Sequence, residues 1–153
     1  MKFFEGENIQ VIWQTGKLYF ERFKHLQSSS VKIFDFISDM NSAYSAGDLI
    51  VARAGSSTIF EAALLGLAVI FVPSKYVAAN HQYHNAKVIK EESAGDLIKD
   101  DELKNELTKK INELISDEET LSRLRTNIKK FAKPNAAYEI AESAIRLAEG
   151  KQA

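Results

Sequence analysis

Four short apolar runs constrain the fold of this chain more than any other feature of its sequence. The runs are rich in β-branched and aromatic residues, and they cover residues 9–13, 31–36, 48–53 and 68–73. Segments long enough for a crossover helix separate the last three runs, whose near-continuous apolar character is typical of parallel strands covered on both faces. The pattern predicts an α/β fold with a Rossmann-like, doubly wound parallel sheet flanked by helices. Any ligand is then expected at the carboxyl ends of the strands.

Helical periodicity predicts the remaining elements. Apolar residues recur at helical spacing among charged ones, and helices are expected over residues 17–26, 102–116, 118–132 and 136–149. Two further helices are expected to begin near positions 56 and 81. The last helix carries a broad apolar stripe, which indicates docking against another surface. The sequence shows no linker or internal repeat, so residues 1–153 are expected to form a single domain.

The overall composition narrows the class of protein. A chain of 153 residues that is 45% hydrophobic can bury a core without disulfides or metal, and the absence of Cys favours a reducing compartment. A formal net charge of -1 disfavours nucleic acid as a partner. The apolar runs are far shorter than the roughly 20 residues of a membrane span, and the first residues lack the pattern of a signal peptide. A cytoplasmic location is therefore expected.

The loop after the third apolar run carries the first candidate site. Gly55 permits a tight turn, and Ser56, Ser57 and Thr58 supply hydroxyl groups where the next helix is expected to begin. A helix N-terminus presents free backbone N–H groups and the positive end of the helix dipole, which together favour a phosphate. The alternative that these residues leave open is an ordinary helix cap by Ser56 or Ser57.

Glu61 adds a carboxylate near this N-terminus. It follows Thr58 by three residues, so both side chains lie on the same face of a helix. A carboxylate can accept two hydrogen bonds from a vicinal diol such as a ribose, and a phosphate at the helix tip with a diol one turn deeper indicates a nucleotide. The alternative is a first-turn acid that stabilises the helix dipole by about 0.3–1 kcal/mol.

The second candidate segment, residues 73–86, follows the fourth apolar run. His81 and Gln82 open the helix expected there, at the same edge of the sheet, where their side chains can reach a sugar. His81 and His84 are three residues apart and can share a helix face, which raises a metal site, but the sequence offers no third convergent ligand. We interpret His84 as an ordinary surface histidine.

The third candidate segment lies at the end of the second apolar run. Phe36 and Ile37 occupy the same edge of the sheet, so exposed backbone there can pair with a planar base while Phe36 packs beside it. Residues 13–16 are similarly placed, and Gly16 permits close approach of the backbone to a ligand. The alternative is that the apolar residues at this strand end belong to the core.

Five sequence segments together resemble the carboxyl-terminal half of the MurG family of glycosyltransferases. They span nearly the whole chain and read WQTGK, FISDM, AYSAGDLIVARAGSSTIFEAALLG, IFVPSKYVAANHQYHNA and IKKFAKPNAAYEIAE. The resemblance implies one incomplete half of a GT-B fold. It also implies transfer of N-acetylglucosamine (GlcNAc) from UDP-GlcNAc to undecaprenyl-pyrophosphoryl-N-acetylmuramoyl-pentapeptide (lipid I), which yields lipid II for peptidoglycan.

The resemblance further implies which residues bind UDP-GlcNAc. The family's phosphate and ribose positions correspond here to Gly55, Ser56, Ser57, Thr58 and Glu61. Its uracil positions correspond to Phe36 and Ile37, with the Ile37 backbone as the base reader. Its GlcNAc positions correspond to His81 and Gln82, where His81 departs from the Gln that is commonest in the family. Arg53 and Asn85 also fit the family pattern.

The partners implied by the resemblance lie largely outside this chain. The family reaction needs no metal or cofactor. Its amino-terminal, acceptor-binding domain, which binds lipid I, is expected to be absent here, together with the first strand of the donor-binding domain. The resemblance therefore implies no catalytic residue in this chain, which is expected to be inactive alone, and a parent enzyme peripheral on the cytoplasmic face of the plasma membrane.

Two alternatives to this function stay open. The chain can be the donor-binding subunit of a two-chain GlcNAc transferase, in which a separate chain binds the acceptor. It can also be a non-catalytic module that binds nucleotide sugars.

Overall fold

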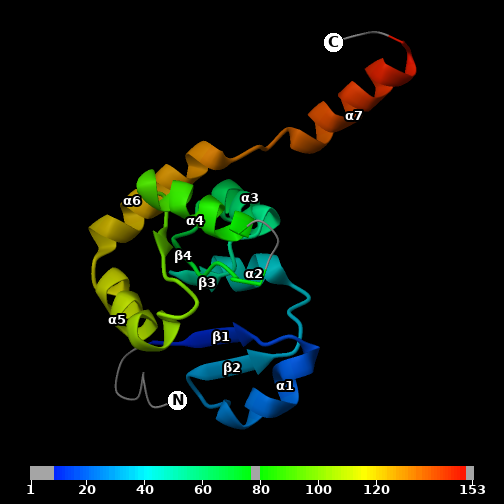
Figure 1. Ribbon diagram of the computed structural model, residues 1–153. Helices are drawn as coiled ribbons and strands as arrows, with labels where there is room; N and C mark the ends of the chain where they lie inside the picture. Colours follow the sequence, from blue (N-terminus) through cyan, green and yellow to red (C-terminus); the bar gives the residue numbers. More distant parts are fainter. Residues whose placement is uncertain (1–8, 77–79, 151–153) are drawn as a thin grey trace. The chain divides into compact units, whose positions relative to one another are not determined.

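The computed structural model describes residues 9–76 and 80–150 (Figure 1). The chain divides into two compact units, Met1–Gly47 and Asp48–Ala153. Each unit contains parallel strands flanked by helices, so the predicted fold class is confirmed. The strands belong to two sheets, one in each unit, whereas the apolar runs predict one continuous sheet.

The first unit is built on two parallel strands. Its elements, in chain order, are β1 (Val11–Gln14), α1 (Lys17–Phe23), the 3-10 helix η1 (Lys24–Leu26), β2 (Val31–Phe34) and α2 (Met40–Ser45). Val31 and Ile33 of β2 are buried, and the ring of Trp13 lies 4.9 Å from that of Phe23, centroid to centroid. Because successive side chains of a strand alternate between faces, Phe34 is exposed.

The second unit has three parallel strands in the order β3-β4-β5. Its elements are β3 (Ile50–Ala52), α3 (Ser56–Leu65), β4 (Val69–Phe71), α4 (His81–Glu91), β5 (Asp96–Leu97), α5 (Leu103–Ile115), α6 (Glu118–Ile128), the 3-10 helix η3 (Lys129–Phe131) and α7 (Ala136–Ala148). In the register of the sheet, Ile50 lies opposite Val69, and Phe71 lies opposite Leu97. The apolar runs do not predict β5, because it is two residues long and one of them is charged.

The central strand β4 carries the core of the second unit. All its side chains are completely buried, and successive ones point to opposite faces of the sheet. Val69 and Phe71 pack in one cluster with residues of α3 and α4, whereas Ile70 packs in another with residues of α5 and α6. Burial on both faces explains why this strand is apolar at every position.

The helices predicted from periodicity are all present, and two of them end in a 3-10 turn. Local residues set their boundaries. Asp117 caps α6, because its carboxylate accepts a hydrogen bond from the Thr120 amide at 2.9 Å. Gly66 ends α3 in the left-handed region, with φ of 67°, and a Cβ at this position would collide with the side chain of Lys129.

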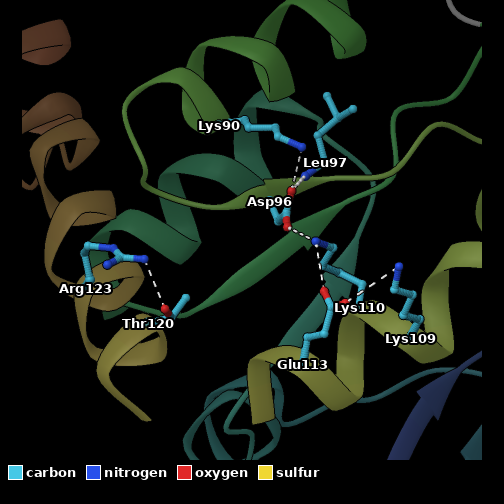
Figure 2. Close-up of polar contacts among 8 residues, drawn as sticks. All are labelled: Lys90, Asp96, Leu97, Lys109, Lys110, Glu113, Thr120 and Arg123. Carbon is cyan, nitrogen blue, oxygen red and sulfur yellow. Dashed lines mark hydrogen bonds and ion pairs between the residues drawn. The ribbon is translucent and has the colours of Figure 1, made fainter. Parts of the chain in front are cut away.

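An ion-paired cluster fastens β5 to α4 and α5 (Figure 2). The Asp96 carboxylate pairs with Lys90 at 2.9 Å and with Lys110 at 3.2 Å, and it accepts a hydrogen bond from the Leu97 amide at 2.8 Å. Burial raises the pKa of Asp96. The hydrogen bonds from Lys90 and Leu97, together with the charges of both lysines, outweigh burial and hold this pKa below its ordinary value.

The last helix, α7, has no buried residue. Its large apolar side chains are exposed by more than half, namely those of Tyr138, Ile140, Ile145 and Leu147. The stripe predicted from the sequence is therefore present and lies open in the described part of the chain. None of the helices described is long and apolar enough to cross a membrane.

Candidate functional site

The carboxyl ends of β3, β4 and β5 lie at one edge of the second unit's sheet, because the strands are parallel. The loop toward α3 begins at Arg53, and the loop after β4 begins at Val72. The start of α4 lies at the same edge, since Gln82 and Asn85 make hydrogen bonds with these two loops. The structure thus brings together the candidate phosphate and sugar residues of this unit.

The first turn of α3 presents the predicted hydroxyl groups. The helix begins at Ser56, and Gly55 is its N-cap residue. The N-cap residue is thus a glycine and neither serine, so the interpretation of Ser56 or Ser57 as an ordinary cap is wrong. Both serines are exposed and Thr58 is half-buried. Backbone N–H groups and hydroxyls therefore gather at the positive end of the helix.

Gly55 lies directly before α3 and carries no side chain. Its φ of -71° is one that any residue adopts, so a tight turn does not require glycine here. A Cβ at Gly55 would have only Thr58 Oγ1 near it, at 4.0 Å. The absent side chain thus leaves open space directly before α3.

Glu61 lies one turn further along α3, on the same face as Thr58. The first turn of this helix contains no acidic residue, so the alternative of a first-turn acid that stabilises the dipole is wrong. The Glu61 side chain is exposed. An exposed carboxylate in this position can accept hydrogen bonds from a diol whose phosphate lies at the helix tip.

Gln82 lies in the first turn of α4 and is half-buried. Its Oε1 atom accepts a hydrogen bond from the Ser74 amide at 2.8 Å. This contact holds the loop after β4 and fixes the orientation of the carboxamide. The NH2 group of Gln82 is then the part of the side chain that can donate to a sugar hydroxyl.

The two histidines of α4 are both exposed. His81 is the first residue of the helix and follows Asn80, whose backbone is left-handed with φ of 53°. The ring of His84 lies edge-on to that of Tyr83, with centroids 6.0 Å apart. Within residues 9–76 and 80–150, no group of three or more His, Asp or Glu side chains can hold a metal ion.

Asn85 and Arg53 make polar contacts that join the loops of this edge. Asn85 Nδ2 donates to the carbonyl of Ala54 at 3.3 Å, which ties α4 to the loop before α3. Arg53 Nη1 donates to the carbonyl of Val72 at 3.2 Å and to Asp100 Oδ1 at 2.5 Å. These side chains therefore brace the backbone around the candidate site.

The candidate base-binding residues lie in the first unit, after β2. Phe36 is 64% exposed, so the alternative of a core position is wrong for this residue. The amide of Ile37 donates to Gln14 Oε1 at 2.8 Å. A base that accepts from this amide must take the place of Gln14. Gly16 has φ of 76° at the N-terminus of α1.

Gln14 and Asp100 make contacts to these candidates that the sequence motifs do not reveal, although Gln14 itself lies within the candidate residues 13–16. Gln14 ends β1, and Asp100 follows β5. The signal for both is their place at or shortly after the carboxyl end of a strand. For Asp100 that signal is weak, because β5 itself is too short and polar to be recognised.

Comparison with known families assigns this chain to one of them. Residues 1–142 match the glycosyltransferase family 28 C-terminal domain, which is most of the chain. The chain belongs to this family. The match confirms that the chain belongs to a glycosyltransferase family, as predicted from the sequence.

Two relatives of this family 28 domain carry the name UDP-N-acetylglucosamine--N-acetylmuramyl-(pentapeptide) pyrophosphoryl-undecaprenol N-acetylglucosamine transferase. The protein of Christiangramia forsetii is 38% identical over 151 residues, which are 99% of this chain and 41% of the relative. That of Cytophaga hutchinsonii is 41% identical over 143 residues, which are 94% of this chain and 39% of the relative. The chain thus spans about two fifths of the length of these relatives.

Solved structures with the same fold include the crystal structure of Acinetobacter baumannii MurG. It has a TM-score of 0.76 and 27% identity, and the match covers 87% of this chain and 42% of that protein. The glycosyltransferase of kitacinnamycin matches with a TM-score of 0.61 and 20% identity over 88% of this chain and 34% of that protein, which shows a likeness of fold alone. The MurG resemblance and the GT-B half predicted from the sequence are confirmed.

Proposed function

We propose that this chain is the UDP-GlcNAc-binding part of a MurG-type glycosyltransferase, which transfers GlcNAc from UDP-GlcNAc to lipid I in peptidoglycan synthesis. The observation that carries this proposal is the first turn of α3, which follows the glycine N-cap Gly55 and presents three hydroxyl groups at the sheet edge, with Glu61 one turn behind it. The names of the two relatives and the likeness to MurG support it. On this proposal the chain binds the donor and supplies no catalytic residue.

The proposed chemistry of this chain is stabilisation of the leaving group. When an acceptor hydroxyl attacks the anomeric carbon, negative charge grows on the departing diphosphate. The hydroxyls of Ser56, Ser57 and Thr58 and the N–H groups at the positive end of α3 are placed to stabilise that charge. Glu61 binds the ribose hydroxyls, which holds the nucleotide while the bond to the sugar breaks.

The remaining candidate residues are assigned to the sugar and the base. Gln82 donates to a GlcNAc hydroxyl through its NH2 group, and the neighbouring His81 makes the contact that a Gln makes in most of the family. In the first unit, the exposed ring of Phe36 packs beside the uracil and the Ile37 backbone reads its edge.

The acceptor side of the reaction is assigned to the part of the relatives that this chain does not match. Lipid I binds there, in the amino-terminal acceptor domain, and its undecaprenyl chain places the whole enzyme at the cytoplasmic face of the plasma membrane. No feature of the described residues favours a two-chain transferase or a non-catalytic sensor over this proposal.

The proposal is tested by isothermal titration of UDP-GlcNAc, UDP and GDP into the folded chain. Binding selective for the uridine nucleotides is expected. Glu61→Ala is expected to weaken UDP-GlcNAc binding by about 1–3 kcal/mol, because the ribose hydroxyls lose a charged hydrogen-bond acceptor.

Glu106→Ala provides the matched control, since Glu106 is an exposed glutamate of α5. This variant should bind UDP-GlcNAc like the unmodified chain. Equal affinity of Glu61→Ala and Glu106→Ala would refute the ribose role of Glu61. A folded chain that binds GDP as well as UDP would refute the uridine specificity.

A further inference from the structure

Arg53 forms a bridge across the carboxyl edge of the sheet in the second unit. Its Nη1 atom contacts the Val72 carbonyl at 3.2 Å and the Asp100 carboxylate at 2.5 Å. Arg53 directly follows β3, Val72 directly follows β4, and Asp100 lies in the segment after β5. One guanidinium nitrogen therefore connects the carboxyl ends of all the strands in this sheet.

Asp100 is the fixed end of this bridge. Its side chain is 21% exposed, whereas that of Arg53 is 52% exposed. The segment that leads to Asp100 is held on β4, because the Ile98 amide donates to the Phe71 carbonyl at 3.0 Å. The carboxylate thus offers an acceptor that is less exposed than the guanidinium, which takes its position from it.

The loops joined by the bridge carry the proposed donor-binding residues. From Arg53 the chain leads directly into the first turn of α3. From Val72 it leads to Ser74, whose amide is held by Gln82. The Val72 amide also donates to the Ala52 carbonyl at 2.8 Å, so the two loops begin side by side. A displaced Arg53 side chain therefore changes the spacing between the phosphate and sugar contacts.

We propose that Asp100 is a positioning residue of the donor site, which acts through Arg53 to hold the loop before α3 against the loop after β4. This inference rests on the proposed function, since the loops matter as the site for UDP-GlcNAc. Hydrogen bonds to a phosphate weaken steeply with poor distance or angle, so the placement of the first turn of α3 affects affinity. The ion pair itself is partly exposed, since the Arg53 side chain is 52% exposed, and it adds little to folding stability.

A purely electrostatic role of Asp100 predicts a different result. Its negative charge lies near the proposed diphosphate site, so loss of the charge alone would tighten UDP-GlcNAc binding. Asp100→Asn removes the charge and keeps an oxygen that accepts from Arg53, whereas Asp100→Ala removes both. These two variants therefore separate positioning from charge.

The experiment combines calorimetric titration of the full chain with UDP-GlcNAc and amide hydrogen exchange in buffer. Asp100→Ala is expected to weaken binding about tenfold, the scale of one lost charged hydrogen bond, and to speed exchange in residues 54–58 and 74–76. Asp100→Asn should keep most of the affinity and protection. Asp101→Ala, which removes the same charge from an exposed neighbouring position, should behave like the unmodified chain.

Each outcome decides the inference. Asp100→Ala that binds and exchanges like Asp101→Ala overturns it, and so does tighter binding by both Asp100 variants. If the unmodified chain binds no UDP-GlcNAc, the proposed function fails, and the exchange comparison still decides whether Asp100 positions the loops. Circular dichroism identifies an unfolded variant, in which case Arg53→Met tests the bridge from its other end by the same two measurements.

Discussion

At the scale of single residues, the contact between Gln14 and Ile37 bears most directly on recognition of the base. The Ile37 amide is engaged by Gln14 Oε1 at 2.8 Å, so uracil must displace this side chain before it can accept from the amide. Gln14→Ala removes this acceptor, so the Ile37 amide is available before uracil binds. We expect UDP to bind about two- to tenfold more tightly to this variant, which corresponds to one neutral hydrogen bond. Isothermal titration measures the change.

Gln27→Ala is the matched control for Gln14→Ala. Gln27 also accepts a hydrogen bond from a backbone amide of the first unit, that of Ile33, at 3.5 Å. Its removal should leave the affinity for UDP unchanged. Weaker binding by Gln14→Ala would contradict the prediction and would show that Gln14 itself contacts the nucleotide.

Residues of the site differ in how far the sequence predicts their surroundings. The hydroxyls in the first turn of α3 and the carboxylate of Glu61 can be placed from spacing alone, because a helix fixes its own neighbours. The contacts of Gln14, Arg53 and Asp100 cannot, because each joins residues that are distant along the chain. Spacing says nothing about which distant side chain faces a given backbone group. The ligand roles of the candidate residues stay predictions.

At the scale of helices, α6 and α7 have similar apolar periodicity and opposite surroundings. Ile128 of α6 is completely buried in the core beside α3 and α4, whereas Ile140 of α7 is 69% exposed. We expect Ile128→Ala to lower the free energy of unfolding by about 2–5 kcal/mol, because it leaves a cavity. Ile140→Ala should change it by less than about 0.5 kcal/mol.

Urea denaturation of both variants, followed by circular dichroism, checks this difference. Because the same substitution is made in both helices, the size of the removed side chain is common to both. A loss for Ile140→Ala as large as that for Ile128→Ala would show that α7 is packed against other parts of the chain in solution.

Strands and helices can be predicted from the sequence where their buried residues follow a regular pattern. β4 is apolar at every position because both its faces are covered, and the amphipathic helices show their period for the same reason. The short strand β5 shows neither signal, since it has two residues and one of them, Asp96, is charged and paired with lysines. The periodicity of α7 correctly predicts a helix and an apolar stripe, but no pattern says what the stripe contacts.

At the scale of the whole chain, two sheets replace the single sheet predicted from the apolar runs. The runs specify which residues form strands and that the strands are parallel. They do not specify which strand pairs with which, because pairing depends on contacts between distant segments. The stability of the second unit depends on ion pairs between distant residues, such as those of Asp96, which join β5 to both α4 and α5.

The Asp96 cluster predicts how stability of the second unit depends on pH. The folded-state pKa of Asp96 lies below its ordinary value of 3.8, because the hydrogen bonds and charges of Lys90, Leu97 and Lys110 outweigh the effect of burial. The unfolded chain therefore takes up a proton first as the pH falls. The stabilisation is complete well above pH 3.8 and is lost as the pH falls through the folded-state pKa.

Asp96→Asn removes this contribution. We expect it to lower the free energy of unfolding at pH 7 by about 1 kcal/mol, as for a partly exposed ion pair, and the difference from the unmodified chain should shrink as the pH falls below about 4. Urea denaturation between pH 3 and pH 7 measures both, with Asp101→Asn as the control at an exposed position. A difference between Asp96→Asn and the unmodified chain that stays constant over this range would mean that the lost packing of the side chain, and not its charge, causes the destabilisation.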